Sequence, residues 1–136
     1  MTGPTPYVLF AGTARPALEF YAETFGGSAE LHSFAEFGRD DGPPGFIAHG
    51  HLLTPDISLY AADVGGEESS FVAQGIMLSL LGTADPPTLH SWFDRLSQQG
   101  STVQPLEERP WGASDGQVID RFGVHWLIGY EARPAV

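Results

Sequence analysis

Two histidines separated by a single residue are the most suggestive chemical feature of this sequence. His49 and His51 flank Gly50 within the apolar stretch FIAHGHLL, residues 46–53. Alternate residues of a β-strand face the same side, so two imidazoles at this spacing could bind one divalent ion or line a ligand cavity. Two ligands alone rarely hold a metal ion. The spacing therefore leaves metal binding and polar cavity lining both open.

Composition excludes several kinds of chemistry. The chain of 136 residues has no cysteine, no lysine and a formal net charge of −11. Without these residues there is no thiolate nucleophile, no zinc–thiolate site and no lysine Schiff base. The acidic charge repels phosphate backbones and anionic membrane surfaces, so we expect neither nucleic acid nor a membrane as a partner. The carboxylate pairs Asp40–Asp41 and Glu67–Glu68 lie in glycine-rich stretches, where we expect surface positions.

Further motifs that would identify a function are absent from the sequence. There is no Gly-x-Ser-x-Gly elbow, phosphate-binding loop or dinucleotide fingerprint. The apolar run near the N-terminus, YVLFA at residues 7–11, is too short for a signal peptide or a membrane span. We therefore expect a cytoplasmic protein.

The first half of the chain predicts the order β, α, β, β, β. Residues 7–11 are rich in strand-forming side chains, and the following helix has apolar residues at Leu18, Tyr21 and Phe25 before it stops at Gly26-Gly27. Three strands are then predicted, over residues 29–37, 46–53 and 57–62.

The second half predicts the same order again. A strand over residues 76–81 precedes Asp85 and two prolines, which favour a helix start, and the helix carries one apolar stripe of Leu89, Trp92, Phe93 and Leu96. Strands are then predicted at residues 101–108, 116–122 and 124–130. Gly-Thr-Ala follows the first strand in both halves, at residues 12–14 and 82–84. We interpret the chain as an internal duplication.

The predicted fold class is therefore α+β, with two tandem βαβββ modules in one domain of residues 1–136. Module one spans residues 5–63, a linker residues 64–74, and module two residues 75–131. One helix on a four-stranded sheet leaves a sheet face bare, so we expect the modules to pair as a curved mixed sheet around a cleft that takes a ligand.

Several short strings in this order resemble one known group of proteins. They are PY at residues 6–7, ALEFY at 17–21, FGG at 25–27, WGA at 111–113 and DRFGV at 120–124. With the tandem repeat, they are similar to the PhnB-like branch of the vicinal oxygen chelate superfamily, which includes glyoxalase I, bleomycin-resistance proteins and extradiol dioxygenases. This branch is often called 3-demethylubiquinone methyltransferase-like. The resemblance covers nearly the whole chain and implies a homodimer.

The resemblance also shows a departure at the metal site. In the metal-dependent members, four His, Gln or Glu ligands come from the first and last strand of each module. Alignment through the strings above places Pro6, Ser58, Ile76 and Leu127 at these positions. None of them offers an imidazole or a carboxylate. We therefore expect no metal at the usual site.

Our leading hypothesis is a PhnB-like protein that binds a small aromatic or amphipathic molecule in the cleft without a metal or other cofactor. The branch often has His-Ala-Glu where this chain has His49-Gly50-His51, which implies that this strand lies near the cleft. The pocket residues that we expect are Phe10, His49, His51, Ser58, Ile76, Leu78, Trp111, His125 and Leu127.

Two other functions stay open. One is a metal-dependent lyase, isomerase or oxygenase with a relocated site, in which His49, His51 and His125 hold one divalent ion. The other is a structural dimerisation module with a collapsed cleft. The sequence does not decide whether the protein is an enzyme.

Overall fold

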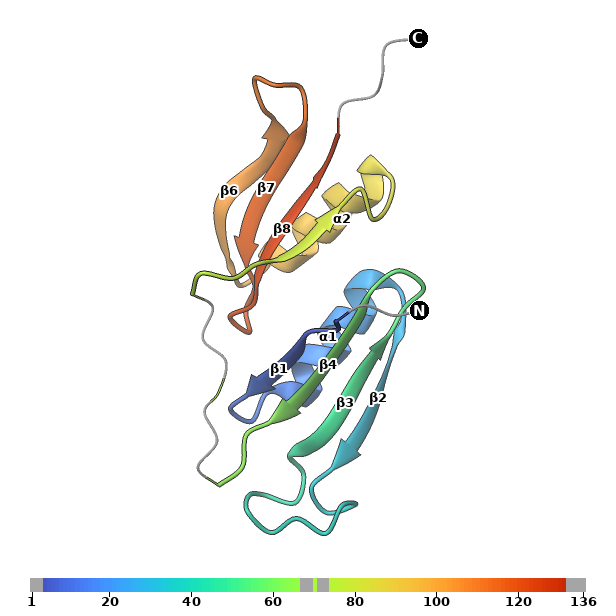
Figure 1. The fold of residues 1–136 in the computed structure, drawn as a ribbon, viewed down its shortest axis with the longest axis vertical. Helices are drawn as coiled ribbons and strands as arrows, with labels where there is room; N and C mark the ends of the chain where they lie inside the picture. The colour runs from blue at the N-terminus through green and yellow to red at the C-terminus, as the bar shows by residue number, and fades with distance from the viewer. Residues whose placement is uncertain (1–3, 67–69, 71–73, 132–136) are drawn as a thin grey trace. The chain divides into compact units, whose positions relative to one another are not determined.

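The computed structural model describes residues 4–66, 70 and 74–131, so the Glu67–Glu68 pair lies outside the described residues. The chain divides into two compact units, residues 1–71 and 72–136. The first contains β1 (Tyr7–Phe10), α1 (Ala14–Phe25), β2 (Ser28–Ser33), β3 (Ile47–Leu53) and β4 (Ser58–Asp63). The second contains β5 (Leu78–Leu81), α2 (Pro86–Ser97), β6 (Ser101–Glu108), β7 (Ser114–Ile119) and β8 (His125–Tyr130) (Figure 1).

Both units have the same sheet topology. The strand order is β1-β4-β3-β2 in the first unit and β5-β8-β7-β6 in the second. In each, the first strand runs parallel to the last, and the other pairs are antiparallel. The predicted α+β fold of two βαβββ modules is confirmed, as two four-stranded mixed sheets.

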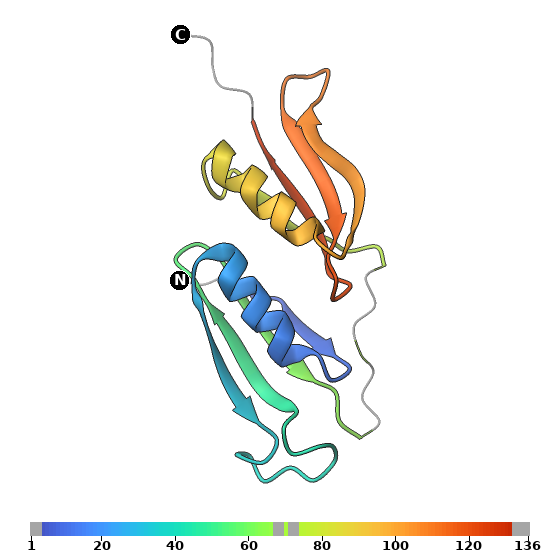
Figure 2. The same cartoon turned by 180° about the vertical axis from the view of Figure 1, so that it is seen from behind.

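Each helix packs on one face of the sheet of its own unit (Figures 1 and 2). The predicted stripe of α2 is its buried side: Leu89, Trp92, Phe93 and Leu96. Asp85 begins α2 by accepting a hydrogen bond from the Thr88 N–H, which lowers the pKa of Asp85. α1 ends at Gly26, whose φ of +77° suits glycine. Both helices have 12 residues, and neither is long enough to cross a membrane.

The strand predicted over residues 29–37 ends earlier, at Ser33. The Ser33 N–H donates to the Glu36 carboxylate over 2.8 Å, and the Glu36 N–H donates to the Ser33 hydroxyl over 3.2 Å. This reciprocal pair favours a turn over a longer strand. Phe34 is buried, and the Arg39 guanidinium lies 3.9 Å from the centre of its ring. The prediction was therefore wrong beyond Ser33.

Strand boundaries in the second unit also differ from the prediction. β5 begins at Leu78 rather than at residue 76, so Ile76 precedes the strand and is exposed. β7 begins at Ser114 rather than at residue 116, which adds Ser114 and Asp115 to the sheet. It also ends at Ile119 rather than at residue 122, because the Gly123 N–H donates to the Asp120 carbonyl and closes a turn there. These shifts change which side chains the sheet positions.

Each unit contains one buried carboxylate that accepts hydrogen bonds from neighbouring segments of the same unit. Asp63, at the end of β4, accepts hydrogen bonds from the N–H groups of Ala14 in α1 and Ile47 in β3, both over 2.9 Å. Asp120, after β7, accepts from the N–H groups of Phe122 and Val124 and from the Trp126 indole. Both carboxylates are 3% exposed. They satisfy buried donors, so their role is structural.

We predict that Asp120→Asn lowers the free energy of unfolding by about 2–4 kcal/mol. The amide has the same volume as the carboxylate, but its NH₂ group must face either the Trp126 indole N–H or the backbone N–H groups of Phe122 and Val124. Urea denaturation followed by circular dichroism measures the change. Asp94→Asn, at an exposed position of α2, is the matched control and should stay within about 0.5 kcal/mol of the parent. Equal stability of the two variants would contradict the role of Asp120.

Candidate functional site

In the first unit, alternate residues of β3 point to opposite faces of the sheet. A Cβ atom on Gly50 would collide with Leu18 of α1, so Gly50 faces the helix. His49 and His51 therefore point to the other face, which we call the open face because no helix of the same unit covers it among the described residues. The two imidazoles share one face, as their spacing predicted.

The histidines belong to an aromatic cluster on this open face. The ring of Tyr60, on β4, lies with its centroid 5.3 Å from that of His49 and 4.6 Å from that of His51. The Tyr7 hydroxyl is 3.0 Å from His49 Nδ1, and the Ser58 hydroxyl is 3.3 Å from His51 Nε2. Sequence reasoning found Ser58 but missed both tyrosines, although Tyr7 and Tyr60 are cross-strand partners in β1 and β4.

A third histidine extends this face at β2. His32 Nε2 lies 3.0 Å from the Glu30 carboxylate, and its Nδ1 lies 3.4 Å from that of Glu36. The hydrogen bond from His32 lowers the pKa of Glu30, and the same bond, with the charge of Glu36, raises the pKa of His32. Sequence reasoning missed the group, although Glu30 and His32 have the same alternating spacing as His49 and His51.

Phe10 and Leu78 lie away from the open faces. Phe10 is 4% exposed and is the cross-strand partner of Asp63, which bonds to α1, so Phe10 belongs to the core on the helix side. Leu78 is the partner of the buried Trp126 on the helix side of the second sheet. Within its own unit, therefore, Phe10 does not share a face with His49 and His51, and Leu78 does not share a face with His125 and Leu127.

His125 and Leu127 lie on the open face of the second unit. They alternate along β8 with Trp126 and Ile128, which are buried on the helix side. The His125 Nε2 atom is 3.0 Å from the Gln117 side-chain oxygen on β7. The three histidines of the metal hypothesis are thus divided between the units, two on β3 and one on β8. Among the described residues, no three His, Asp or Glu side chains form a group that could hold a metal ion.

The strand register corrects the alignment of the metal positions. Gly12 follows β1 and Gly82 follows β5, both with positive φ, so these two glycines are equivalent positions. Pro6 precedes Gly12 by the same number of residues as Ile76 precedes Gly82, so Pro6 and Ile76 are equivalent as well. Leu9 pairs with Ala62, however, and the equivalent Ser79 pairs with Leu127. Leu127 therefore corresponds to Ala62 and not to Ser58. None of these side chains is an imidazole or a carboxylate, so the donor set does not fit the metal of the superfamily.

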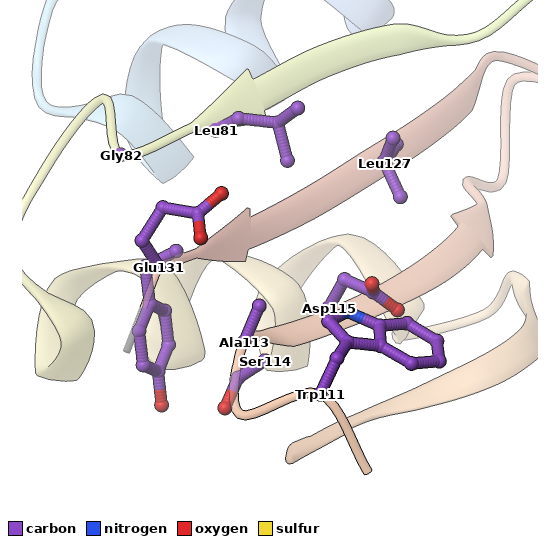
Figure 3. A pocket seen from close by; sticks show the side chains of 9 residues that line it. Leu81, Gly82, Trp111, Ala113, Ser114, Asp115, Leu127 and Glu131 are labelled. Carbon is purple, nitrogen blue, oxygen red and sulfur yellow. The ribbon is translucent and has the colours of Figure 1, made fainter. Parts of the chain in front are cut away.

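A pocket of about 360 Å³ lies at one end of the sheet in the second unit. It brings together Trp111 and Leu127, which the sequence predicted as pocket residues, with side chains that sequence reasoning missed. The principal lining residues are Leu81, Trp111, Ser114, Asp115, Leu127 and Glu131 (Figure 3).

The pocket is hollow because the centre of its floor has no side chain. Gly129 of β8 pairs with Leu81 on one side and with Asp115 on the other. A Cβ atom there would collide with the Ser114 carbonyl oxygen and would meet the Cβ of Asp115 at 2.9 Å. Across the three strands, Leu81 and Asp115 therefore carry side chains, and Gly129 between them contributes only backbone to the floor of the pocket.

Hydrogen bonds hold the loop that carries Trp111. The Arg109 N–H donates to the Ala113 carbonyl over 2.8 Å, and the Gly112 N–H donates to the Arg109 carbonyl over 2.9 Å. Gly112 has a φ of +96°, which suits glycine at this turn. The Arg109 guanidinium also binds the Asp115 carboxylate over 2.9 Å. Trp111 is 71% exposed on this ordered loop, next to an apolar hollow.

Comparison with known proteins gives matches along the whole chain. A family model described as 3-demethylubiquinone-9 3-methyltransferase matches residues 2–129. Protein YjdN of Escherichia coli K12 is 28% identical, over 91% of this chain and 92% of its own length. The Mycobacterium bovis protein Mb0911c is 30% identical, over 92% of this chain and 81% of its own length.

Solved structures show the same fold. Protein PA1353 from Pseudomonas aeruginosa has a TM-score of 0.80 at 29% identity and covers 98% of this chain and 100% of its own. A putative 3-demethylubiquinone-9 3-methyltransferase, a PhnB protein from Bacillus cereus, has a TM-score of 0.77 at 20% identity, over 95% and 99% of the two chains. A glyoxalase/bleomycin resistance/dioxygenase superfamily member from Sphaerobacter thermophilus has a TM-score of 0.55 at 17% identity, over 96% and 99%. The chain therefore belongs to the 3-demethylubiquinone-9 3-methyltransferase-like, or PhnB-like, family, and it shares its fold with the glyoxalase/bleomycin resistance/dioxygenase superfamily member.

Proposed function

We propose that this protein binds a small aromatic or amphipathic molecule in the Trp111 pocket, without the metal of the superfamily. The observation that carries the proposal is a largely exposed indole on an ordered loop beside an apolar hollow. Exposed aromatic rings in concave sites are typical of ligand binding. The proposal does not depend on the methyl transfer named in the family description.

Apolar contact supplies the affinity in this proposal. Leu81 and Leu127 lie on neighbouring strands, and Leu81 is among the exposed large apolar side chains. A ligand ring between them and Trp111 removes apolar surface from water on both partners. At about 25 cal/mol per Å², burial of roughly 100 Å² contributes about 2.5 kcal/mol before the costs of association. An aromatic ligand also gains a ring–ring contact with the indole.

Sequestration of the ligand would follow from binding alone, and a chemical transformation stays an alternative. Three further expectations remain predictions: a ligand cleft between the units, a homodimer and a cytoplasmic location. The open face of the first unit, with its two tyrosines and three histidines, would supply polar contacts to a ligand that reaches it. Sedimentation equilibrium of the tag-free protein tests the homodimer.

We predict that Trp111→Ala weakens binding of the uncharged probe N-phenyl-1-naphthylamine about tenfold or more, because the indole supplies the largest apolar contact in the pocket. The rise in probe fluorescence on binding measures the affinity. Trp111→Phe keeps an aromatic ring and should retain most of it.

Phe37→Ala is the matched control for this experiment. Phe37 is also a large exposed aromatic residue, but it stacks on His32 in the first unit and lines no part of the pocket. Equal losses in Trp111→Ala and Phe37→Ala, or no loss in either, would contradict the pocket as the binding site.

We also predict that protein purified without a histidine tag contains much less than one divalent ion per chain, measured by elemental analysis. The reason is the absence of imidazole and carboxylate ligands from the positions equivalent to the superfamily metal site. About one ion per chain that disappears in a His49→Ala, His51→Ala double variant would instead support the metalloenzyme hypothesis.

A further inference from the structure

A second hollow of about 680 Å³ adjoins the Trp111 pocket in the same unit. The two share three lining residues, Ser114, Tyr130 and Glu131. The second hollow continues towards the beginning of α2 and the end of β6, where His90, Glu107 and Glu108 line it. It therefore lies on the α2 side of the sheet and meets the first pocket, which lies on the open face, at the end of the sheet.

Ser114 marks the junction of the two hollows. The residue is only 8% exposed, yet its hydroxyl forms no hydrogen bond with any described residue, and it lines both pockets. Figure 3 shows its side chain among those around the Trp111 pocket. The oxygen is not one of the fully buried side-chain atoms that lack a partner, so it is accessible from the hollow and can form a hydrogen bond with a bound group.

The charge of the second hollow is negative. Three glutamates line it, and Glu107 is paired with Arg109 at 3.3 Å. No hydrogen bond or ion pair to the carboxylates of Glu108 and Glu131 is found among the described residues. A cationic group there would gain from nearby negative charge in a partly enclosed site, and the net charge of the whole chain acts in the same direction.

The beginning of α2 does not make the hollow an anion site. Its first two residues are Pro86 and Pro87, which have no N–H group. The next N–H groups, of Thr88 and Leu89, already donate to Asp85. The donors that bind anions at other helix starts are therefore missing or used.

Tyr130 joins the apolar and acidic parts. It is the cross-strand partner of Ser114, and its hydroxyl lies 2.9 Å from His90 Nε2, which fixes the phenol ring at the wall of the hollow. An ammonium group near this ring would gain a cation–π contact beside the Ser114 oxygen.

We propose that the two hollows form one site for an amphipathic organic cation, with its apolar part at Trp111 and its ammonium group among Ser114, Tyr130, Glu108 and Glu131. This inference rests on the proposed function, because the apolar part occupies the pocket assigned there. The ligand class is thus an aromatic or apolar body with a short chain that ends in an amine.

Three dansyl probes that differ in the charge of their tail test this proposal: dansylcadaverine with an ammonium, dansylamide without charge and dansylglycine with a carboxylate. At low ionic strength we expect dansylcadaverine to bind about tenfold more tightly than dansylamide, and dansylglycine to bind more weakly than both. The preference for the ammonium should shrink as salt is added.

Two variants locate the recognition of the ammonium. Glu108→Gln with Glu131→Gln should remove most of the preference, whereas Glu19→Gln with Asp40→Asn, at exposed positions of the first unit, changes the net charge equally and should leave it intact. Ser114→Ala should weaken dansylcadaverine severalfold and leave dansylamide unchanged.

The outcomes separate this inference from the proposed function. Equal binding of the charged and uncharged probes, with loss of both in Trp111→Ala, overturns the cation site and keeps the pocket. If Glu19→Gln with Asp40→Asn also removes the preference for dansylcadaverine, the preference comes from the net charge of the chain, and the cation site is overturned. If none of the probes binds, the proposed function fails, and the cation site fails with it.

Discussion

Each unit has one helix for a four-stranded sheet, so one face of the sheet is covered and the other stays open. This constraint determines which side chains can contact a ligand. The helix covers one face of the sheet and buries alternate residues of its central strands, so the intervening residues form an open face. On β3, Gly50 lies under α1 while His49 and His51 point away from it. On β8, Trp126 and Ile128 complete the core while His125 and Leu127 point away. His49, His51, His125 and Leu127 are therefore side chains of β3 and β8 that the core does not use.

The elements with a strong periodic pattern could be predicted from the sequence. The stripe of α2, the glycines after α1 and the repeated Gly-Thr-Ala junction reflect local requirements of helices and turns, and the duplication followed from them. The face of a side chain is harder to predict, because a displacement of one residue along a strand reverses it. Phe10 and Leu78 were assigned to the pocket for this reason, whereas their cross-strand partners place both beside the helix.

The pocket depends on contacts that no local pattern signals. Trp111 is held by an arginine that binds Asp115, a residue beyond the far end of the loop, and the floor is open because Gly129 lies between two longer side chains of the neighbouring strands. Sequence reasoning identified Trp111 and Leu127 through the family resemblance. It could not identify Ser114, because the significance of this residue lies in its position in the wall of both hollows, which is a property of the folded structure.

The central claim, that the second unit binds its ligand against Trp111, is tested most directly by the indole N–H signals in a ¹⁵N–¹H correlation spectrum during titration with dansylcadaverine. The chain has three tryptophans, of which Trp92 and Trp126 are buried in the core of that unit. We predict that the Trp111 signal shifts in a saturable manner, together with the backbone amides of Ser114 and Glu131, while the other two indoles change little. A saturable shift confined to His49, Tyr60 and their neighbours, with Trp111 unchanged, would contradict the account.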